Sequence, residues 1–145
     1  MSESIWKSPA TLDELNALGA NTAADFLGIR ITEVGPDFLR GTLPVSERTV
    51  QPMGLIHGGI NVVLAETLGS MAANMAVDTQ KYFCVGQEIN ANHVRGVRTG
   101  GVTGTARVKY LGRTSQVWEI DIVDERGRLT CVSRLTMAVV PHGRA

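Results

Sequence analysis

The chain has few aromatic residues, no excess charge of either sign and only two cysteines. Aromatic residues make up 5% of the 145 residues, so a core must be built mainly from aliphatic side chains. Fourteen Lys and Arg balance 14 Asp and Glu, which disfavours a general role in binding nucleic acid. Cys84 and Cys131 lie far apart without a CxxC spacing, which excludes a disulfide framework or a cysteine zinc site and fits a reducing compartment.

Long apolar runs are also missing. No stretch reaches about 18 purely apolar residues, so no membrane span is expected. The N-terminal residues, MSESIWKSPATLDEL, lack the apolar run of a signal peptide, so we expect a cytoplasmic protein. A composition of 43% hydrophobic and 19% charged residues predicts a globular protein. The length suits a single domain over residues 1–145, in which residues 1–10 form a flexible lead-in.

The first third of the chain predicts two short helices followed by two strands. Thr11 and Glu14 have the spacing of a capping box, which places a helix at residues 12–18. A second helical turn is expected at residues 22–27, before Gly28. Strands at 29–34 and 38–43 flank a Gly-Pro-Asp turn, and residues 44–52 are expected to form a loop.

The last part of the chain predicts an antiparallel sheet. Residues 81–98 form a long extended run, and residues 102–110 alternate between apolar and polar side chains. Residues 118–122 alternate in the same way, a hairpin connection is expected at 124–127, and residues 131–140 form the last strand. Strands joined by short turns favour an antiparallel meander.

Between these regions lies the most informative segment, a predicted helix over residues 58–76. Glu66 is the one formal charge between Arg48 and Asp78 when His57 is neutral. The apolar residues fall on nearly all sides of the helical wheel, which predicts a buried helix. One long buried helix with five or six antiparallel strands predicts an α+β fold, in which a curved antiparallel sheet wraps around the helix.

Glu66 is the first candidate for chemistry, because a buried carboxylate is costly to desolvate. It could instead be a structural residue, paired with an arginine or capped by main-chain amides. Ser70 and Asn74 follow at helical spacing and form a narrow polar stripe with it. This stripe favours a polar cleft and a functional Glu66.

The helix start supplies a second candidate site. His57, Gly58 and Gly59 lie where main-chain N–H groups are unpaired, which is the geometry of an oxyanion hole or an anion site. Alternatively, the two glycines simply permit a sharp turn. Gln51 on the preceding loop could hydrogen-bond at the site or be solvated, and His93 on a strand could be structural. The spacing of His57, His93 and Glu66 does not support a metal site, so none is expected.

Glu66 and Gly58 are too far apart to act together within one chain. Eight residues of helix span about 12 Å, too long for Glu66 to act on a carbonyl held at Gly58. If both groups act in one site, they must come from different chains. Two helices packed antiparallel about a two-fold axis would achieve this, so we expect at least a homodimer with two shared sites.

Residues 51–70, QPMGLIHGGINVVLAETLGS, resemble the hotdog-fold acyl-CoA thioesterases, in the 4-hydroxybenzoyl-CoA thioesterase branch with its catalytic Glu on the long helix. Residues 86–95 and 111–118, GQEINANHVR and LGRTSQVW, are most similar to one subgroup. That subgroup includes the 1,4-dihydroxy-2-naphthoyl-CoA thioesterase of menaquinone synthesis and the proofreading thioesterase of enterobactin synthesis. The resemblance covers about residues 5–139, although the linker at 77–83 looks about one residue longer.

The resemblance implies roles for individual residues. Glu66 would be the nucleophile or the general base, the Gly58 N–H would polarise the thioester carbonyl with help from Gln51, His57 would orient the thioester, and Ser70 would hold water or the acyl group. Matching segments would contact the CoA thioester: Gly86, His93, Val94, Arg95, Gly96, Tyr110, Leu111, Gly112, Arg113, Thr114 and Ser115. Arg95 and Arg113 suit the phosphates.

The implied enzyme hydrolyses an aryl or medium-chain acyl-CoA and needs no cofactor, because CoA is part of the substrate. Its usual assembly is a dimer of dimers, so a homodimer or homotetramer is expected, with no nucleic-acid or membrane partner. Two other functions stay open: a hotdog hydratase or dehydratase, and a non-catalytic acyl-CoA-binding protein.

Overall fold

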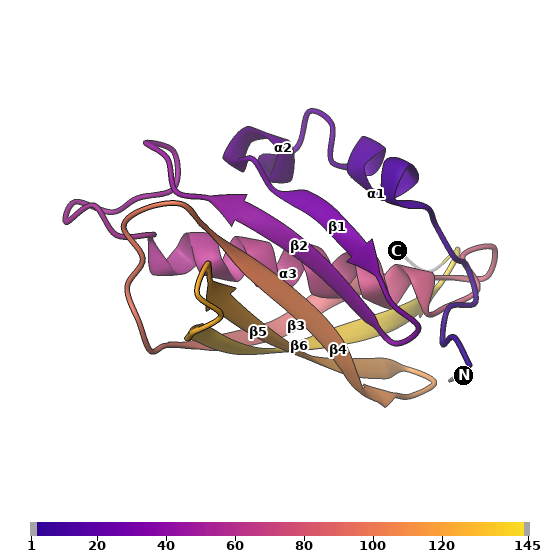
Figure 1. The fold of residues 1–145 in the computed structure, drawn as a ribbon. Coiled ribbons are helices and arrows are strands. Elements are labelled where there is room, and N and C mark those ends of the chain that lie inside the picture. The colour runs from indigo at the N-terminus through magenta and orange to yellow at the C-terminus, as the bar shows by residue number, and fades with distance from the viewer. Residues whose placement is uncertain (1–2, 144–145) are drawn as a thin grey trace.

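The computed structural model describes residues 3–143 and has one six-stranded antiparallel sheet curved around one long helix (Figure 1). The order of the strands across the sheet is β1-β2-β4-β5-β6-β3. The strands are β1 Arg30–Val34, β2 Phe38–Pro44, β3 Tyr82–His93, β4 Gly101–Leu111, β5 Ser115–Asp124 and β6 Leu129–Pro141. The helices are α1 Leu12–Leu18, α2 Ala23–Leu27 and α3 Gly58–Met75. The predicted α+β hotdog fold is confirmed.

The short helices follow their predicted signals. The Thr11 hydroxyl accepts from the Glu14 N–H, and the Glu14 carboxylate accepts from the Thr11 N–H, so the capping box at α1 is formed. Helix α2 ends at Gly28, whose φ of 82° lies in the left-handed region that favours glycine. The one wrong element is the extended run at 81–98. Strand β3 ends at His93, where the Val94 and Arg95 N–H groups both turn to the Thr130 carbonyl.

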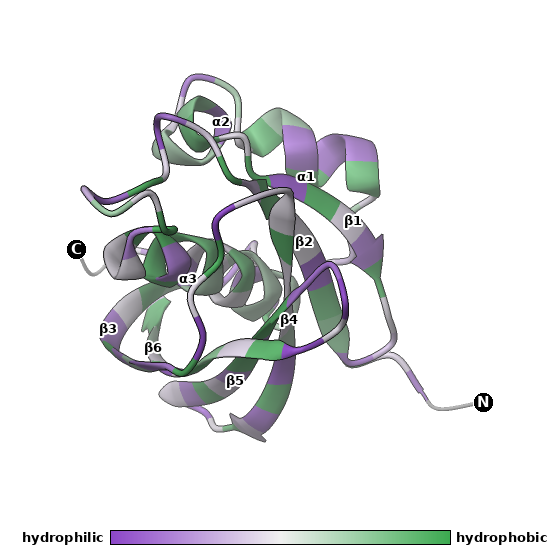
Figure 2. Ribbon diagram, turned by 60° about the vertical axis from the view of Figure 1, so that its left-hand side comes forward, coloured by the Kyte–Doolittle hydropathy of each residue, from purple (hydrophilic) through white to green (hydrophobic). Residues whose placement is uncertain are grey.

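Glycines let α3 approach the sheet closely. A Cβ atom at Gly69 would lie 2.5 Å from Leu135 Cδ2, and one at Gly104 would lie 2.9 Å from Leu68 Cδ1. One side of α3 is therefore packed tightly on the sheet, through Leu64, Ala65, Leu68, Ala72 and Ala73. In Figure 2, α3 lies within the curve of the sheet, with hydrophobic segments along the helix and along the neighbouring strands.

The prediction that α3 is buried on all sides is wrong for the single chain. Val62, Val63, Glu66, Thr67 and Ser70 are half-buried, and they line an open cavity of about 340 Å³ along the helix. The sheet has only one concave face, so it covers only one side of α3. An apolar side of the helix is left for another partner.

The lead-in at residues 1–10 was expected to be flexible; residues 1–2 lie outside the described residues, whereas Ile5, Trp6 and Ser8 make specific contacts. The Trp6 ring stacks on that of Trp118, with centroids 6.2 Å apart, and its indole N–H donates to the Gly35 carbonyl at 2.8 Å. The Ser8 hydroxyl donates to the Val77 carbonyl at 2.8 Å. Residues 5–10 therefore form a wall beside the C-terminal half of α3. Within residues 3–143, no helix is long and apolar enough to cross a membrane.

Candidate active site

The first turn of α3 leaves one main-chain donor available. His57 is the N-cap, and its Nδ1 accepts from the Gly59 N–H at 2.9 Å. The Ile60 and Asn61 N–H groups both donate to the His57 carbonyl. In the part of the chain described, the Gly58 N–H has no acceptor. An unpaired N–H at the positive end of an 18-residue helix is suited to stabilise a developing oxyanion.

The cap also determines the role of the His57 ring. Because Nδ1 accepts a hydrogen bond, it carries no proton, and the proton of the neutral ring lies on Nε2. The ring is exposed, so Nε2–H can donate to a ligand near the helix start.

Gln51 lies on a tight turn just before the helix. The Gln51 N–H donates to the Leu55 carbonyl, and the Gly54 N–H donates to the Gln51 carbonyl. The side-chain Oε1 accepts from the Met53 N–H, which leaves the Nε2 group as the donor that can face a ligand. The Arg98 guanidinium donates to the Met53 carbonyl at 2.6 Å and holds the turn.

His93 belongs to the same end of the domain as Gly58. A Cβ atom at Gly58 would lie 2.7 Å from His93 Nε2, so the imidazole lies directly against the helix start. His57, Gly58 and His93 form one cluster, at the end of β3 and the beginning of α3.

Glu66 lies in a different cluster. Its carboxylate carbon and both oxygens are 3.5 Å from the position of a Cβ atom at Gly86, so the carboxylate lies against the main chain of β3. Strand β3 has an irregularity at that point, between Gly86 and Glu88. Across residues 3–143, Glu66 forms no hydrogen bond and no ion pair, so the structural alternative of a Glu paired with an arginine is not what the chain adopts.

Ser70 lies one turn beyond Glu66, between two cavities. Its hydroxyl donates to Met137 Sδ at 3.8 Å, a weak bond that another acceptor can replace. On one side is the open cavity with Glu66. On the other side is a cavity of about 450 Å³ with a mostly apolar lining, which includes Pro9, Ala10, Leu15, Leu18, Met71 and Met75.

The segments expected to contact CoA lie at opposite ends of the sheet. Val94, Arg95 and Gly96 follow the last residue of β3, and the Arg95 N–H donates to Thr130. Residues 110–115 include the β4–β5 turn, where the Thr114 carbonyl accepts from Val139, the β6 residue that pairs with Cys84 near the start of β3.

The turn with Arg113 borders a cavity of about 550 Å³ whose lining includes Lys7, Lys81 and Tyr82. Sequence reasoning missed these two lysines because nothing in the local pattern separates them from other surface lysines. The cavity joins chain segments far apart in sequence, so only the fold brings Lys7 close to Arg113.

The two thiols are not candidate nucleophiles. Burial raises the pKa of Cys84 to about 11, and burial together with the nearby Asp121 carboxylate also raises the pKa of Cys131. Both thiols therefore stay protonated near neutral pH. Within the described residues there is also no group of three or more His, Cys, Asp or Glu side chains that could hold a metal ion.

Comparisons with known proteins agree with the fold. Residues 53–131 match the Thioesterase superfamily. The putative esterase PA1618 of Pseudomonas aeruginosa is 52% identical over 143 residues, covering 98% of this chain and 99% of that protein. The 1,4-dihydroxy-2-naphthoyl-CoA hydrolase of Escherichia coli (strain K12) is 50% identical over 136 residues, covering 94% of this chain and 99% of that protein.

Two further similarities cover nearly the whole chain. The proofreading thioesterase EntH of Cronobacter turicensis is 50% identical over 137 residues, covering 94% of this chain and 98% of that protein. The crystal structure of a mutant of thioesterase PA1618 from Pseudomonas aeruginosa superposes with a TM-score of 0.93 at 51% identity, covering 95% of this chain and 99% of that chain.

The curved antiparallel sheet and the long central helix define a hotdog-type fold. The chain belongs to the thioesterase superfamily. The prediction of a thioester hydrolase is confirmed at the level of this family.

Proposed function

We propose that the protein hydrolyses an acyl-CoA to the free acid and CoA, in a site shared by two subunits. Glu66 of one subunit supplies the nucleophile or general base, and the Gly58 N–H of the other stabilises the oxyanion. The observation that carries this proposal is the separation within one chain: Glu66 lies against Gly86, whereas Gly58 lies against His93.

The free edge of β3 supports the shared site. Strand β3 ends the sheet, so one of its edges has no neighbouring strand among residues 3–143. A second copy can pair antiparallel along that edge about a two-fold axis at Asn90, which is midway between Gly86 and His93 once the irregularity between Gly86 and Glu88 is taken into account. Gly86 of one subunit then faces His93 of the partner subunit, and Glu66 faces Gly58 of the partner subunit.

The same pairing covers the open side of α3. The two α3 helices then run antiparallel, and the half-buried Val62, Val63 and Thr67 lie at their contact. This removes from water the apolar surface that the sheet of one chain leaves open. It also lowers the local dielectric around Glu66 and the substrate carbonyl, which strengthens electrostatic stabilisation there.

The chemistry follows from these positions. Either the Glu66 carboxylate removes a proton from water, whose oxygen attacks the thioester carbon, or a carboxylate oxygen attacks directly and water hydrolyses the resulting anhydride. In both routes the carbonyl oxygen becomes negative, and the Gly58 N–H, the Gln51 amide and His57 Nε2–H are the donors beside it. The C–S bond then breaks and CoA leaves as the thiol after protonation.

The cavities suggest where the substrate lies. The apolar cavity of about 450 Å³ beside Ser70 suits an aryl or medium-chain acyl group. Arg95 and Arg113 lie at opposite ends of one chain, but antiparallel pairing brings the Arg113 end of one subunit beside the Arg95 end of its partner. We assign both to the CoA phosphates, contacted from different subunits.

The proposal includes the assembly and setting expected from the sequence. The active unit is a homodimer, which can associate further into a homotetramer, and the reaction uses side-chain and main-chain groups without a cofactor. Two buried free cysteines suit the reducing cytoplasm, and the balanced net charge disfavours a nucleic-acid partner.

The test is a panel of acyl-CoAs assayed for release of free CoA with DTNB, the thiol reagent. Aryl and medium-chain acyl-CoAs should be hydrolysed faster than acetyl-CoA, and Glu66→Gln should lower the rate of CoA release by at least about 100-fold. Hydration of an enoyl-CoA without CoA release would indicate a hydratase. Acyl-CoA binding without any turnover would indicate a binding protein.

A further inference from the structure

Asn74 is the member of the polar stripe on α3 for which the proposed chemistry has no use. Its side-chain Oδ1 accepts from the Cys84 N–H at 2.8 Å. Its Nδ2 donates to the Ser70 carbonyl at 2.9 Å and to the Cys84 carbonyl at 3.2 Å. Both Nδ2 protons and one Oδ1 lone pair are therefore satisfied by main-chain groups, and the carboxamide joins α3 to β3.

The Cys84 N–H and carbonyl, which hydrogen-bond to Asn74, lie on the free edge of β3. In an antiparallel sheet, the main-chain groups of successive residues point to opposite edges. The Val139 N–H points to the side of β6 on which β5 lies, where it donates to Thr114 in the β4–β5 turn, so the main-chain groups of its partner Cys84 point away from β6. The carboxamide of Asn74 offers one donor and one acceptor to Cys84, as a residue of a neighbouring strand would.

This contact is the directional link between α3 and the start of β3. The apolar packing of α3 on the sheet is non-directional and does not by itself fix how far the helix slides along the strand. The other polar contacts between this part of α3 and the sheet are longer: Gln116 Nε2 to Ala73 O at 3.4 Å, Cys84 Sγ to Ala73 O at 3.6 Å and Ser70 Oγ to Met137 Sδ at 3.8 Å.

The link lies close enough to Glu66 to control it. Glu66 is two turns before Asn74 on the same side of α3, about 12 Å along the helix. Gly86, which the Glu66 carboxylate contacts, is two residues after Cys84, about 7 Å along the strand. A helix and a strand fixed at Asn74 and Cys84 therefore place the carboxylate at Gly86.

We propose that Asn74 is a positioning residue for the hydrolysis. It binds the main-chain groups of Cys84 on the free edge of β3 and thereby holds the Glu66 carboxylate against Gly86. It also blocks pairing at Cys84, so the part of the edge that can pair with a second copy of the chain begins at Gly86. Residues 86–93 are then the stretch of β3 available for pairing. The inference rests on the proposed function.

The test compares Asn74→Leu with Asn16→Leu. Asn16 on α1 makes the same two bonds on the other edge of the sheet, to the N–H and carbonyl of Ile31 at 2.8 and 3.0 Å, far along the sheet from β3. Both variants lose similar bonds and should lose similar thermal stability. Assayed well below both unfolding midpoints, Asn74→Leu should lose at least about tenfold in kcat with KM within about twofold, because a misplaced base slows chemistry more than binding. Asn16→Leu should keep the wild-type kcat.

A second variant covers the case in which Asn74→Leu does not fold. Asn74→Asp keeps an acceptor for the Cys84 N–H but loses both donations at neutral pH. Its kcat relative to wild type should rise as the pH falls, because the protonated carboxyl regains one donor. A ratio that stays flat with pH would overturn the proposal.

The outcomes separate this inference from the proposed function. If Glu66→Gln is inactive while Asn74→Leu keeps the wild-type kcat, the positioning role is wrong and the function stands. If both asparagine variants lose kcat equally, the effect is general destabilisation and the positioning role is again wrong. If the wild-type enzyme releases no CoA from any thioester, the proposed function is wrong. Hydrogen exchange then tests separately whether Asn74 holds β3 in place. Unchanged exchange at residues 84–86 in Asn74→Leu would show that Asn74 does not hold β3.

Discussion

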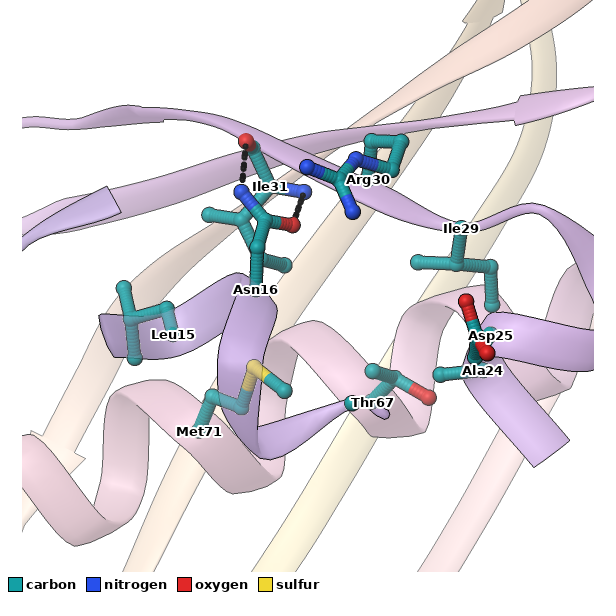
Figure 3. A pocket seen from close by; sticks show the side chains of 10 residues that line it. Leu15, Asn16, Ala24, Asp25, Ile29, Arg30, Ile31, Thr67 and Met71 are labelled. Carbon is teal, nitrogen blue, oxygen red and sulfur yellow. Dashed lines mark hydrogen bonds between the residues drawn. The ribbon is translucent and has the colours of Figure 1, made fainter. Parts of the chain in front are cut away.

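The two edges of the sheet are treated differently, although an asparagine on a helix contacts each of them. The β1 edge is five residues long, α1 lies beside it, and the Asn16 carboxamide takes both main-chain groups of Ile31 (Figure 3). The β3 edge is 12 residues long, and Asn74 takes the corresponding groups only at Cys84.

The difference shows how a strand edge is closed or left available. A short strand with an irregular register and a helix beside it offers no template for another strand. Most of β3 from Val85 onward is exposed and continuous enough to pair with another chain. The asparagine contact therefore helps to close the β1 edge, whereas on the β3 edge it marks only where the stretch that can pair with another chain begins.

The largest effect is expected from removing the carboxylate that lies on the β3 side. Glu66→Gln should lower kcat by at least about 100-fold, because it removes the base or nucleophile. The fold should survive, because an unpaired charge is being neutralised. Steady-state CoA release and circular dichroism measure the two effects.

The β1 edge supplies the control for this change. Glu33→Gln removes a carboxylate from β1 that pairs with Arg40, and it should leave kcat unchanged. Turnover of Glu66→Gln at the wild-type rate would remove Glu66 from the mechanism.

The next effect tests the open part of β3. Asn90 faces β6, where its carbonyl accepts from the Ser133 hydroxyl, so the N–H of the next residue, Ala91, faces the free edge. Ala91→Pro removes that donor and adds a ring at the edge, which should separate the subunits and lower activity by at least about tenfold. Sedimentation velocity measures the oligomeric state.

Ala91→Thr keeps the N–H and is the matched control, which should remain a fully active oligomer. An Ala91→Pro monomer with wild-type activity would show that one chain suffices for catalysis.

A smaller effect concerns the two ends of the sheet. Arg95→Ala and Arg113→Ala should each raise KM by about tenfold and lower kcat less, because the phosphates lie far from the reacting carbonyl and their loss weakens uniform binding. Initial rates over a range of acyl-CoA concentrations separate the two constants. A collapse of kcat at unchanged KM would place these arginines at the chemistry instead.

The smallest effect, a fourfold difference from wild type, tests the pairing most directly. Glu66→Ala and Gly58→Val should each be inactive, the latter because any Cβ at Gly58 would lie 2.7 Å from His93 Nε2. In a mixed dimer, one of the two shared sites contains both substitutions, and the other contains the wild-type Glu66 and Gly58. Random pairing should therefore restore about a quarter of wild-type activity, by the symmetry of the interface.

The two variants must be mixed by co-expression or co-refolding, and size-exclusion chromatography must show that each still dimerises. If verified mixed dimers recover nothing, Glu66 must reach the carbonyl from its own chain.

The sequence predicted those elements whose signals are local. The capping box at Thr11 and Glu14 began α1 where expected, and the period of two located β4 and β5 to within a few residues. It failed at the end of β3, because nothing in residues 94–98 signals that two N–H groups turn to one carbonyl on β6. It also treated residues 5–10 as loose, because the stacking of Trp6 on Trp118 joins positions far apart in the chain.

The candidate site divides in the same way. Glu66, Ser70, His57 and Gly58 stand out in the sequence because a lone charge on an apolar helix and glycines at a helix start are local patterns, and helix geometry alone separates Glu66 from Gly58. Only the tertiary structure decided that Glu66 lies against Gly86, that His93 lies against Gly58 and that Asn74 closes the strand edge at Cys84. These contacts join a helix to a strand paired at the far side of the sheet, and hydrophobic periodicity does not encode which edge of a strand stays open.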